Sequence, residues 1–323
     1  MLSNRDASPI TLADIQQARL RINSFVRRTP QMSSHAVGER LGTRVDLKLE
    51  LFQKTGSFKV RGAFNKILSA GPANCGKGVV AVSGGNHAQA VAYAARHLAL
   101  KTIIIMPEST PANYVDATRG YGAEIIFAPD ATSAFEKVAE FEAQDWLPIH
   151  PFDDPLVIAG QGTTGLEILE DAPELTDLVI SIGGGGLMTG VATAIKSLKP
   201  DVRIWGVETH GADAMAQALA AGTPVQLPAI TSIARTLGAP SVSHRTLAAA
   251  QLFLESVTVV PDSEAVAGVG FLLERAKVLT EPAAGCTLAA ADRLKKQFGS
   301  HVVLLLCGGN VALNDLIVFH TRQ

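Results

Sequence analysis

Cysteine is scarce in this sequence, with 3 among 323 residues. Cys75, Cys286 and Cys307 lie far apart, so neither a disulfide framework nor a metal site built on closely spaced cysteines is expected. The beginning of the chain, MLSNRDASPITLADIQ, lacks the charged start and apolar run of a secretory signal. These absences predict a protein of a reducing, cytoplasmic compartment.

Long apolar runs and an excess of one charge are also missing. No apolar stretch reaches about 18 residues without a polar interruption, so we expect no membrane-spanning helix. The net charge of -2 gives no electrostatic reason to expect nucleic acid or an anionic membrane as a partner. Aromatic residues make up only 5%, whereas small and aliphatic residues dominate, which is typical of parallel sheets covered by helices.

Strand and helix patterns alternate along the chain. Between about Val79 and Phe152, the apolar segments VVAVS, KTIIIMP, AEIIFAP and LPIHPF alternate with helical spacing. The second half repeats this alternation with DLVISI, RIWGVE, LESVTVVP and HVVLLL. Because 323 residues exceed the usual size of one core, we predict an α/β fold of two open parallel-sheet domains around one cleft. The predicted large domain comprises 1–52 and 151–323, and the small domain comprises 53–150.

A run of glycines, Gly183 to Leu187 in GGGGL, directly follows the predicted strand DLVISI. Glycines between a strand and a helix let backbone N–H groups converge on an anion, and the dipole of the next helix favours negative charge. The run lacks the lysine of a P-loop and the GxGxxG spacing of a dinucleotide fold, which points to one compact phosphate monoester. A tight packing turn explains the glycines equally well.

Lys59 lies in the segment KTGSFKVRGA, where small residues and the apolar Phe58 surround it. We expect LFQKTGSFKVRG to be a polar loop that follows the alternating strand VDLKLE, with helical spacing from Ala63 onward. A lysine in such a loop is usually a solvated charge. If the loop instead directs the amine into a cleft, partial desolvation lowers its pKa and makes it a nucleophile able to form a Schiff base.

Two further turns carry polar residues that packing does not require. Ser83 to His87, SGGNH, lies between a strand and a helix, where N–H groups can hold a carboxylate and the Asn86 amide can bond a ring hydroxyl. His87 is equally consistent with a residue that only begins the helix. Cys307, in CGGN after HVVLLL, is either a small core residue or a neutral partner for a pyridine nitrogen. No Asp or Glu accompanies it to keep such a nitrogen protonated.

Together, SFKVRGA, SGGNH, GGGGL and CGGN resemble the fold-type II pyridoxal-phosphate enzymes, in that family's order and over nearly the whole chain. PFDDPLVIAGQGT, AITSIARTLGAP and TEPAAG look most like liver-type serine dehydratases. The lysine and asparagine loops are closer to the serine/threonine dehydratase and serine racemase branch. The resemblance implies a fold like that of the tryptophan synthase β chain, with pyridoxal 5'-phosphate in the cleft between a cofactor-binding large domain and a small domain that holds the substrate carboxylate.

The resemblance also implies a role for each motif. Lys59 would bind the cofactor and later remove the Cα proton. The other cofactor-binding positions would be Phe58 against the ring, Asn86 on the ring hydroxyl, Gly183, Gly184, Gly185, Gly186 and Leu187 on the phosphate, and Cys307 at the ring nitrogen. The substrate carboxylate would lie among Ser57, Ser83, Gly84, Asn86, His87 and Gln161, with Gly162 beside them.

The implied reaction is β-elimination from a 3-hydroxy amino acid such as L-serine or L-threonine. The substrate amine displaces Lys59, which takes the Cα proton as the β-hydroxyl departs, and the released aminoacrylate hydrolyses to a 2-oxo acid and ammonia. Racemases of the family carry SSGNH, whose second serine is the acid on the face opposite the lysine. Here that position is Gly84, which has no proton to give, so we prefer a dehydratase to a serine-type racemase.

Further expectations come from the resemblance alone. Glu208 and the Ala212 carbonyl match a cation site of the family, with K⁺ favoured because position 214 is alanine. Tyr114 stands where a lysine is common, and side chains between Pro151 and Pro155 together with Arg235 are expected to shape the pocket for the β-substituent. The family expectation is a homodimer.

Two rival hypotheses remain at this point. A β-replacement synthase usually begins its asparagine loop with threonine, and here that residue is Ser83. A non-enzymatic α/β module would use GGGGL for another phosphate ligand, and it would be colourless when purified.

Overall fold

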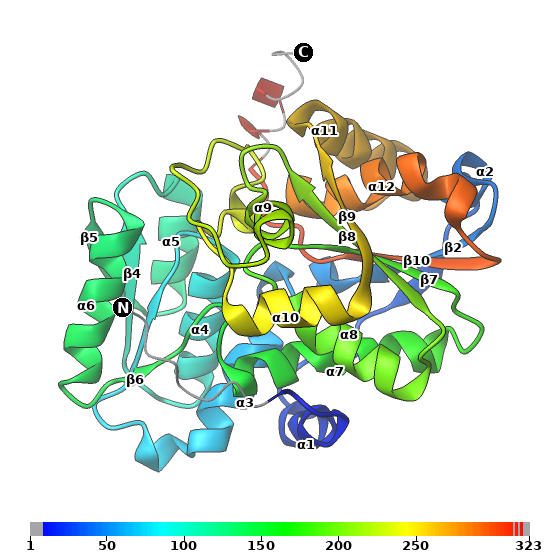
Figure 1. The fold of residues 1–323 in the computed structure, drawn as a ribbon. Coiled ribbons are helices and arrows are strands. Elements are labelled where there is room, and N and C mark those ends of the chain that lie inside the picture. Colours follow the sequence, from blue (N-terminus) through cyan, green and yellow to red (C-terminus); the bar gives the residue numbers. More distant parts are fainter. Residues whose placement is uncertain (1–8, 313, 316, 319–323) are drawn as a thin grey trace.

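The structure is a computed structural model that describes residues 9–312, 314, 315, 317 and 318, and only the backbone of 131 and 132. Its strands form two sheets, which lie side by side in Figure 1. The larger sheet has the order β1-β2-β10-β7-β8-β9, and the smaller has the order β5-β4-β3-β6. This bears out the predicted α/β fold with two parallel sheets, whereas the predicted domain boundaries and roles stay predictions.

The large sheet takes strands from both ends of the chain. All its neighbours are parallel except β1 and β2. Its strands are β1 (Gln31–Ser33), β2 (Arg44–Leu49), β7 (Asp177–Ser181), β8 (Arg203–Thr209), β9 (Leu254–Val260) and β10 (His301–Leu306). The short antiparallel β1 is absent from the sequence prediction because three residues carry too little periodicity to distinguish a strand from a loop.

Helices cover both faces of the large sheet, and the core between them is aliphatic. The central strands β7 and β10 are buried along their whole length, as expected for a sheet covered on both sides. The helices that follow or precede its strands are α1 (Leu12–Ile22), α2 (His35–Leu41), α7 (Pro155–Asp171), α8 (Gly186–Leu198), α9 (Ala214–Ala221), α10 (His244–Phe253), α11 (Asp262–Phe271) and α12 (Pro282–Leu294).

The small sheet is wholly parallel and has its own apolar clusters on its two faces. Its strands are β3 (Val79–Val82), β4 (Thr102–Pro107), β5 (Glu124–Ala128) and β6 (Leu147–Pro148). The helices around it are α3 (Lys59–Ala70), α4 (Asn86–His97), α5 (Ala112–Gly120) and α6 (Ala131–Glu142). Figure 1 shows α3 and α4 on the side that faces the large sheet.

The segment before Ala63 differs from its prediction. It forms two short 3₁₀ turns, Glu50–Phe52 and Lys54–Gly56, and α3 already begins at Lys59. The predicted polar loop is therefore wrong from Lys59 onward, because charges that looked solvated are buried. Arg61 is fully buried and its guanidinium bonds Glu50 at 2.8 and 2.9 Å and Glu167 at 2.7 and 2.9 Å.

Strand β2 also differs from the predicted alternation. Every residue after Arg44 is buried, including Lys48, whose Nζ donates to the Thr29 carbonyl and to Glu167 at 2.8 Å each. A strand covered on both faces buries both sets of side chains, so its polar members must be paired inside the protein. Lys48, Glu50, Arg61 and Glu167 thus form one buried ion cluster between β2, α3 and α7.

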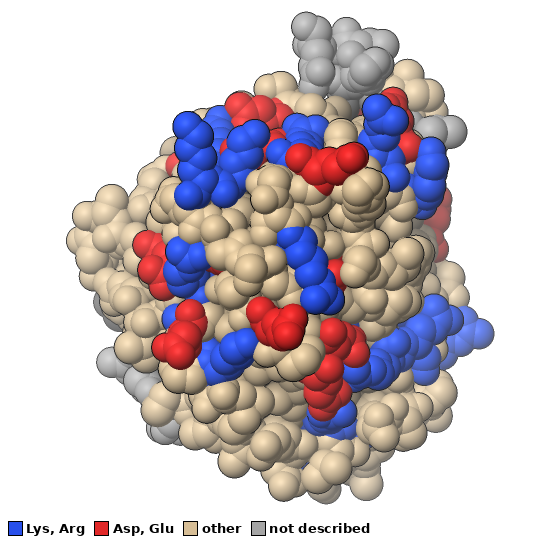
Figure 2. Space-filling view, turned by 90° about the vertical axis from the view of Figure 1, so that its right-hand side faces the viewer, with Lys and Arg blue, Asp and Glu red and all other residues tan. Residues whose placement is uncertain are grey.

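Figure 2 shows Lys and Arg interspersed with Asp and Glu on the face it presents. Among the described residues, no helix combines the length and the apolarity needed to cross a membrane.

Candidate active site

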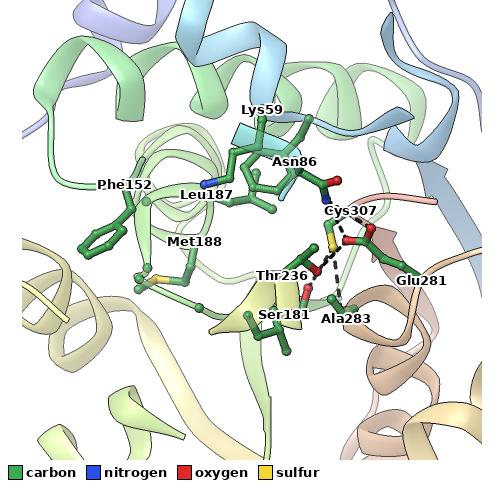
Figure 3. Close-up of a pocket in the computed structure, with 16 residues that line it drawn as sticks. Lys59, Asn86, Phe152, Ser181, Leu187, Met188, Thr236, Glu281, Ala283 and Cys307 are labelled. Carbon is green, nitrogen blue, oxygen red and sulfur yellow. Dashed lines mark hydrogen bonds between the residues drawn. The ribbon is translucent and has the colours of Figure 1, made fainter. Parts of the chain in front are cut away.

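A pocket lies where the carboxyl ends of β7 and β10 meet the beginnings of α3 and α4. Such crevices outside the carboxyl ends of parallel strands are the usual ligand sites of α/β folds. Its lining consists of Phe58, Lys59, Asn86, Phe152, Ser181, Gly183, Gly184, Gly185, Gly186, Leu187, Met188, Thr236, Leu237, Glu281, Ala283 and Cys307. The structure therefore brings together every residue that the sequence placed around a cofactor (Figure 3).

Lys59 stands at the first position of α3, and its side chain extends into the pocket (Figure 3). Its Nζ donates to the Pro151 carbonyl at 2.6 Å. Burial lowers the pKa of Lys59 to about 8, although Cys307 and Glu281 act in the opposite direction. A larger fraction of this amine than of a solvated lysine is thus neutral and nucleophilic near neutral pH.

The glycine run connects β7 to α8, and Gly185 caps that helix with φ of +90°, in the left-handed region that glycine tolerates. A Cβ on Gly184 would lie 2.2 Å from the Phe152 ring, so a larger residue there would displace that ring. No side chain caps α8, which leaves the N–H groups of its first turn available to a ligand. This is the geometry of an anion site at a helix N-terminus.

Cys307 follows β10 at the opposite side of the pocket from Phe152 (Figure 3). Ser181 Oγ donates to its Sγ at 3.3 Å, and Sγ in turn lies 3.7 Å from the Ala283 carbonyl. Burial and the neighbouring Glu281 raise the pKa of the Cys307 thiol to about 12. The thiol is therefore neutral at physiological pH.

The pocket contains a carboxylate that sequence reasoning missed. Glu281 is buried beside Cys307 and accepts hydrogen bonds from Asn86 Nδ2 at 2.9 and 3.1 Å and from Thr236 Oγ1 at 2.9 Å. The prediction that no acidic residue accompanies Cys307 is therefore wrong. The available signal was TEPAAG, in which one acid precedes a helix of buried small residues, α12, whose first residue is Pro282.

The residues predicted to hold a carboxylate do not line this pocket, apart from Asn86. Ser57 is fully buried just before Phe58, and Gln161 lies on α7, where its Oε1 accepts from the Gly62 N–H at 3.3 Å. Ser83 and Gly84 belong to the turn between β3 and α4, in which Ser83 Oγ accepts from the Gly85 N–H at 3.1 Å.

Several buried polar atoms in this neighbourhood have no hydrogen-bond partner in the described structure. They are Thr55 Oγ1, Ser57 Oγ, His87 Nδ1, Thr110 Oγ1 and Gln161 Nε2. Hydroxyl and amide donors that are buried without partners are costly unless a ligand satisfies them. Four of these five groups carry a proton to donate, which fits an anionic ligand such as a carboxylate.

The His87 ring is the exception. Its Nε2 lies 2.8 Å from the Ile149 carbonyl, which can only accept, so Nε2 carries the proton. Burial and the nearby Lys59 lower the pKa of His87 to about 3, and the ring is therefore neutral with a lone pair at Nδ1. Any contribution of His87 to carboxylate binding thus comes from its backbone N–H in the first turn of α4.

At the predicted cation site, backbone N–H groups already bond the Glu208 carboxylate. The two Glu208 oxygens accept from the Met215 and Ala216 N–H groups at 2.9 and 2.8 Å. Burial nevertheless raises the pKa of Glu208 to about 8. The described residues contain no group of three or more His, Cys, Asp or Glu side chains that could hold a metal ion, so a site at Glu208 and Ala212 would rely on backbone carbonyls and stays a prediction.

A sequence model of the pyridoxal-phosphate-dependent enzymes matches residues 22–308. The chain belongs to this family. An L-threonine ammonia-lyase of Geobacter sulfurreducens is 40% identical over 97% of this chain and 78% of the relative. An L-threo-3-hydroxyaspartate ammonia-lyase of Saccharomyces cerevisiae is 39% identical over 93% of each. The structure of maize serine racemase matches with a TM-score of 0.92 and 36% identity over 98% of each chain.

The residues of the pocket fit the family's cofactor. An uncapped helix start and a glycine bend that excludes side chains suit its phosphate, and Lys59 supplies an amine of lowered pKa for its aldehyde. A neutral thiol at Cys307 and an amide at Asn86 suit the ring nitrogen and ring hydroxyl. The role of each residue stays a prediction until it is tested.

Proposed function

We propose that this protein is an ammonia-lyase that converts a neutral 3-hydroxy amino acid such as L-serine or L-threonine to a 2-oxo acid and ammonia. The proposal is supported chiefly by Lys59, whose amine reaches the pocket that Asn86 also lines, and by the glycine at position 84 in the turn just before Asn86. The names of the relatives support ammonia-lyase chemistry and leave the substrate open.

In this proposal Lys59 holds the cofactor and then acts as the general base. When bound, pyridoxal phosphate supplies the electron sink that makes the Cα proton removable. The Lys59 amine, with its pKa lowered to about 8, accepts that proton, and the Pro151 carbonyl is positioned to take a hydrogen bond from the resulting ammonium.

The other polar groups orient the substrate and set the charge of the cofactor ring. The hydroxyls of Thr55, Ser57 and Thr110 and the Gln161 amide are donors without partners, and we propose that they hold the substrate carboxylate. The Cys307 thiol stays neutral and so does not hold a proton on the ring nitrogen. A weaker electron sink favours prompt departure of the β-hydroxyl over long-lived charge at Cα.

The charge of the pocket favours a neutral β-substituent. Among its lining residues the only ionisable side chains are Lys59, Glu281 and Cys307, and Lys59 is engaged in the chemistry. Two basic groups stand near the lining residues: Arg245 pairs with Asp153 at 2.7 Å, and Arg235, which precedes Thr236, is exposed to solvent. A second carboxylate, as in 3-hydroxyaspartate, would therefore be buried near the Glu281 carboxylate without a cation of its own.

The experiment is a substrate panel with two readouts on the purified holoenzyme. L-serine, L-threonine and L-threo-3-hydroxyaspartate are supplied in turn, and 2-oxo acid formation and inversion at Cα are both measured. We expect 2-oxo acid to form from L-serine or L-threonine at least about tenfold faster than Cα is inverted. We expect the same margin over turnover of the acidic substrate. A tenfold difference in rate corresponds to about 1.4 kcal/mol in activation free energy. Inversion that outpaces 2-oxo acid formation would overturn the proposed reaction.

Serine-type racemisation is the second candidate, and one observation favours it. Thr110 Oγ1 would lie 2.5 Å from a Cβ on Gly84, so a hydroxyl occupies the space where a serine side chain at that position would lie. That hydroxyl is buried and has no hydrogen-bond partner among the residues that the structure describes. If it returns a proton to Cα, Thr110→Val abolishes inversion and preserves 2-oxo acid formation, whereas Thr110→Ser preserves both.

We also propose a homodimer in the cytoplasm and a K⁺ ion at Glu208 and the Ala212 carbonyl. The three cysteines are all buried as free thiols, which supports a reducing compartment. Sedimentation analysis and a comparison of activity in K⁺ and tetramethylammonium buffers test the other two proposals.

A further inference from the structure

Glu281 is a buried carboxylate in the pocket to which the proposed reaction assigns no role. It precedes α12 and is only 2% exposed. It lies on the same side of the pocket as Asn86, Thr236 and Cys307, and Figure 3 shows the hydrogen bonds that join it to Asn86 and Thr236. A buried charge of this kind is retained only where its hydrogen bonds are satisfied.

The groups that bond Glu281 all donate to it. They are Asn86 Nδ2, Thr236 Oγ1 and the Asn310 backbone N–H. An ionised carboxylate accepts from all three, whereas the protonated acid would need an acceptor for its own proton. The ionisable groups that face it are Lys59 of α3, Tyr114 of α5, Cys307 and Cys286 of α12, and of these only Lys59 is basic.

The Asn86 amide is fixed from its other side as well. Its Oδ1 accepts from Asn310 Nδ2 at 2.8 Å, and the same Nδ2 donates to the Thr55 carbonyl at 2.8 Å. The Tyr114 hydroxyl donates to the Asn310 carbonyl at 2.5 Å and holds that residue in place. A flipped Asn86 amide would set Oδ1 against the Glu281 carboxylate and Nδ2 against the Asn310 donor, so both contacts would become repulsive.

This arrangement decides which part of Asn86 meets a ligand. The two Glu281 oxygens belong to one carboxylate group, 2.9 and 3.1 Å from Nδ2, whereas the two hydrogens of a planar amide diverge widely. One hydrogen therefore serves Glu281, and the other remains for the pocket. The Asn86 oxygen is turned away toward Asn310.

We propose that Glu281 is a positioning residue that fixes the Asn86 amide so that it presents an N–H donor to the ring oxygen of the cofactor. The proposal rests on the proposed assignment of this pocket to pyridoxal phosphate. It concerns the bound cofactor and not the substrate, so it can fail while the ammonia-lyase activity stands. Hydrogen bonds to a cofactor ring tune its electronic properties, which makes the effect visible in absorption.

The test follows the absorption and circular dichroism of the bound cofactor between pH 6 and 8.5 in holoenzyme variants. In the parent protein we expect a change with a midpoint near pH 7, because burial raises the pKa of Glu281 to about 7 against the opposing effect of its donors. Glu281→Gln removes the titrating group, so its signal stays constant over this range. Thr236→Val removes one donor to the charged form, which raises the midpoint.

Two further measurements complete the design. Glu274→Gln neutralises an exposed carboxylate and keeps the parental midpoint. The affinity of the apoenzyme for pyridoxal phosphate falls by about tenfold in Glu281→Gln, as expected for loss of one oriented hydrogen bond. Three results would each overturn the proposal: a parental protein without a midpoint, a Glu281→Gln variant that titrates like the parent, or a midpoint that Thr236→Val leaves unmoved. If Glu281→Gln does not fold, the Thr236→Val measurement decides.

Discussion

Replacing Arg61 by methionine tests how the buried ion cluster holds the beginning of α3. Arg61 stands two residues after Lys59 and is fully buried, with two bonds to each of Glu50 and Glu167. Methionine fills a similar volume without the charge. Glu167 keeps Lys48 as a partner, but Glu50, which is also fully buried, retains in the described part of the chain only the Thr29 hydroxyl as a side-chain partner.

The expected loss is that of a buried charge left unpaired, about 3–5 kcal/mol of unfolding free energy. With a denaturant dependence of about 3 kcal/mol/M in urea for a chain of this size, the midpoint falls by more than about 1 M. The loss also shrinks as the pH falls. Arg61 and Lys48 hold the pKa of Glu167 below its usual range despite its burial, so the stabilisation they give is present at neutral pH and is lost on acidification through that lowered pKa.

The control is the double variant Arg61→Met/Glu50→Gln, which removes the stranded anion together with its partner. It should recover part of the lost stability, because both partners are then uncharged. Urea titrations at pH 7 and at a pH below the lowered pKa of Glu167, whose ordinary value is 4.5, measure both effects. A loss below about 1 kcal/mol in the single variant, or a double variant no more stable than the single one, would refute this account of the cluster.

Three other changes follow from the site. The rate at which apoenzyme takes up pyridoxal phosphate, measured by stopped-flow absorption, should rise with pH with a midpoint near pH 8, since burial lowers the pKa of Lys59 to about 8, and then level off. A rate that still increases steeply up to pH 10 contradicts the assignment. Iodoacetamide at pH 8 should leave Cys307 unmodified in the native enzyme, because burial raises its pKa to about 12, and rapid alkylation would show an ionised thiol. Substituting tetramethylammonium for K⁺ should lower the melting temperature of the parent and not of Glu208→Gln, and equal shifts would remove the proposed cation site.

The sequence predicted the fold well where patterns are long and repeated. The apolar segments that alternate with helices became β3 to β10 in two sheets, and the glycine turns became helix beginnings at Asn86 and Gly186. Most of the pocket followed from the same turns, because the carboxyl ends of parallel strands lie along one edge of a sheet.

Apart from the short strand β1, the main errors share a physical cause, which is the burial of charge. Lys48, Arg61 and Glu281 are polar in sequence and were assigned to an alternating strand, to a loop or to no role. Each is buried only because a partner distant in the chain pairs with it, as Glu167 does for Arg61 and Asn86 does for Glu281. Pairing between residues far apart in the chain produces no local pattern, so it cannot be recognised in a single sequence.

The central claim is that the amine of Lys59 carries the cofactor. Borohydride reduction of the purified holoenzyme, followed by peptide mapping, tests it most directly. The account predicts that the cofactor becomes fixed to the peptide containing Lys59 and that Lys59→Ala retains none of it and loses turnover. Label on another lysine, or a Lys59→Ala variant that turns over substrate at the parental rate, would contradict it.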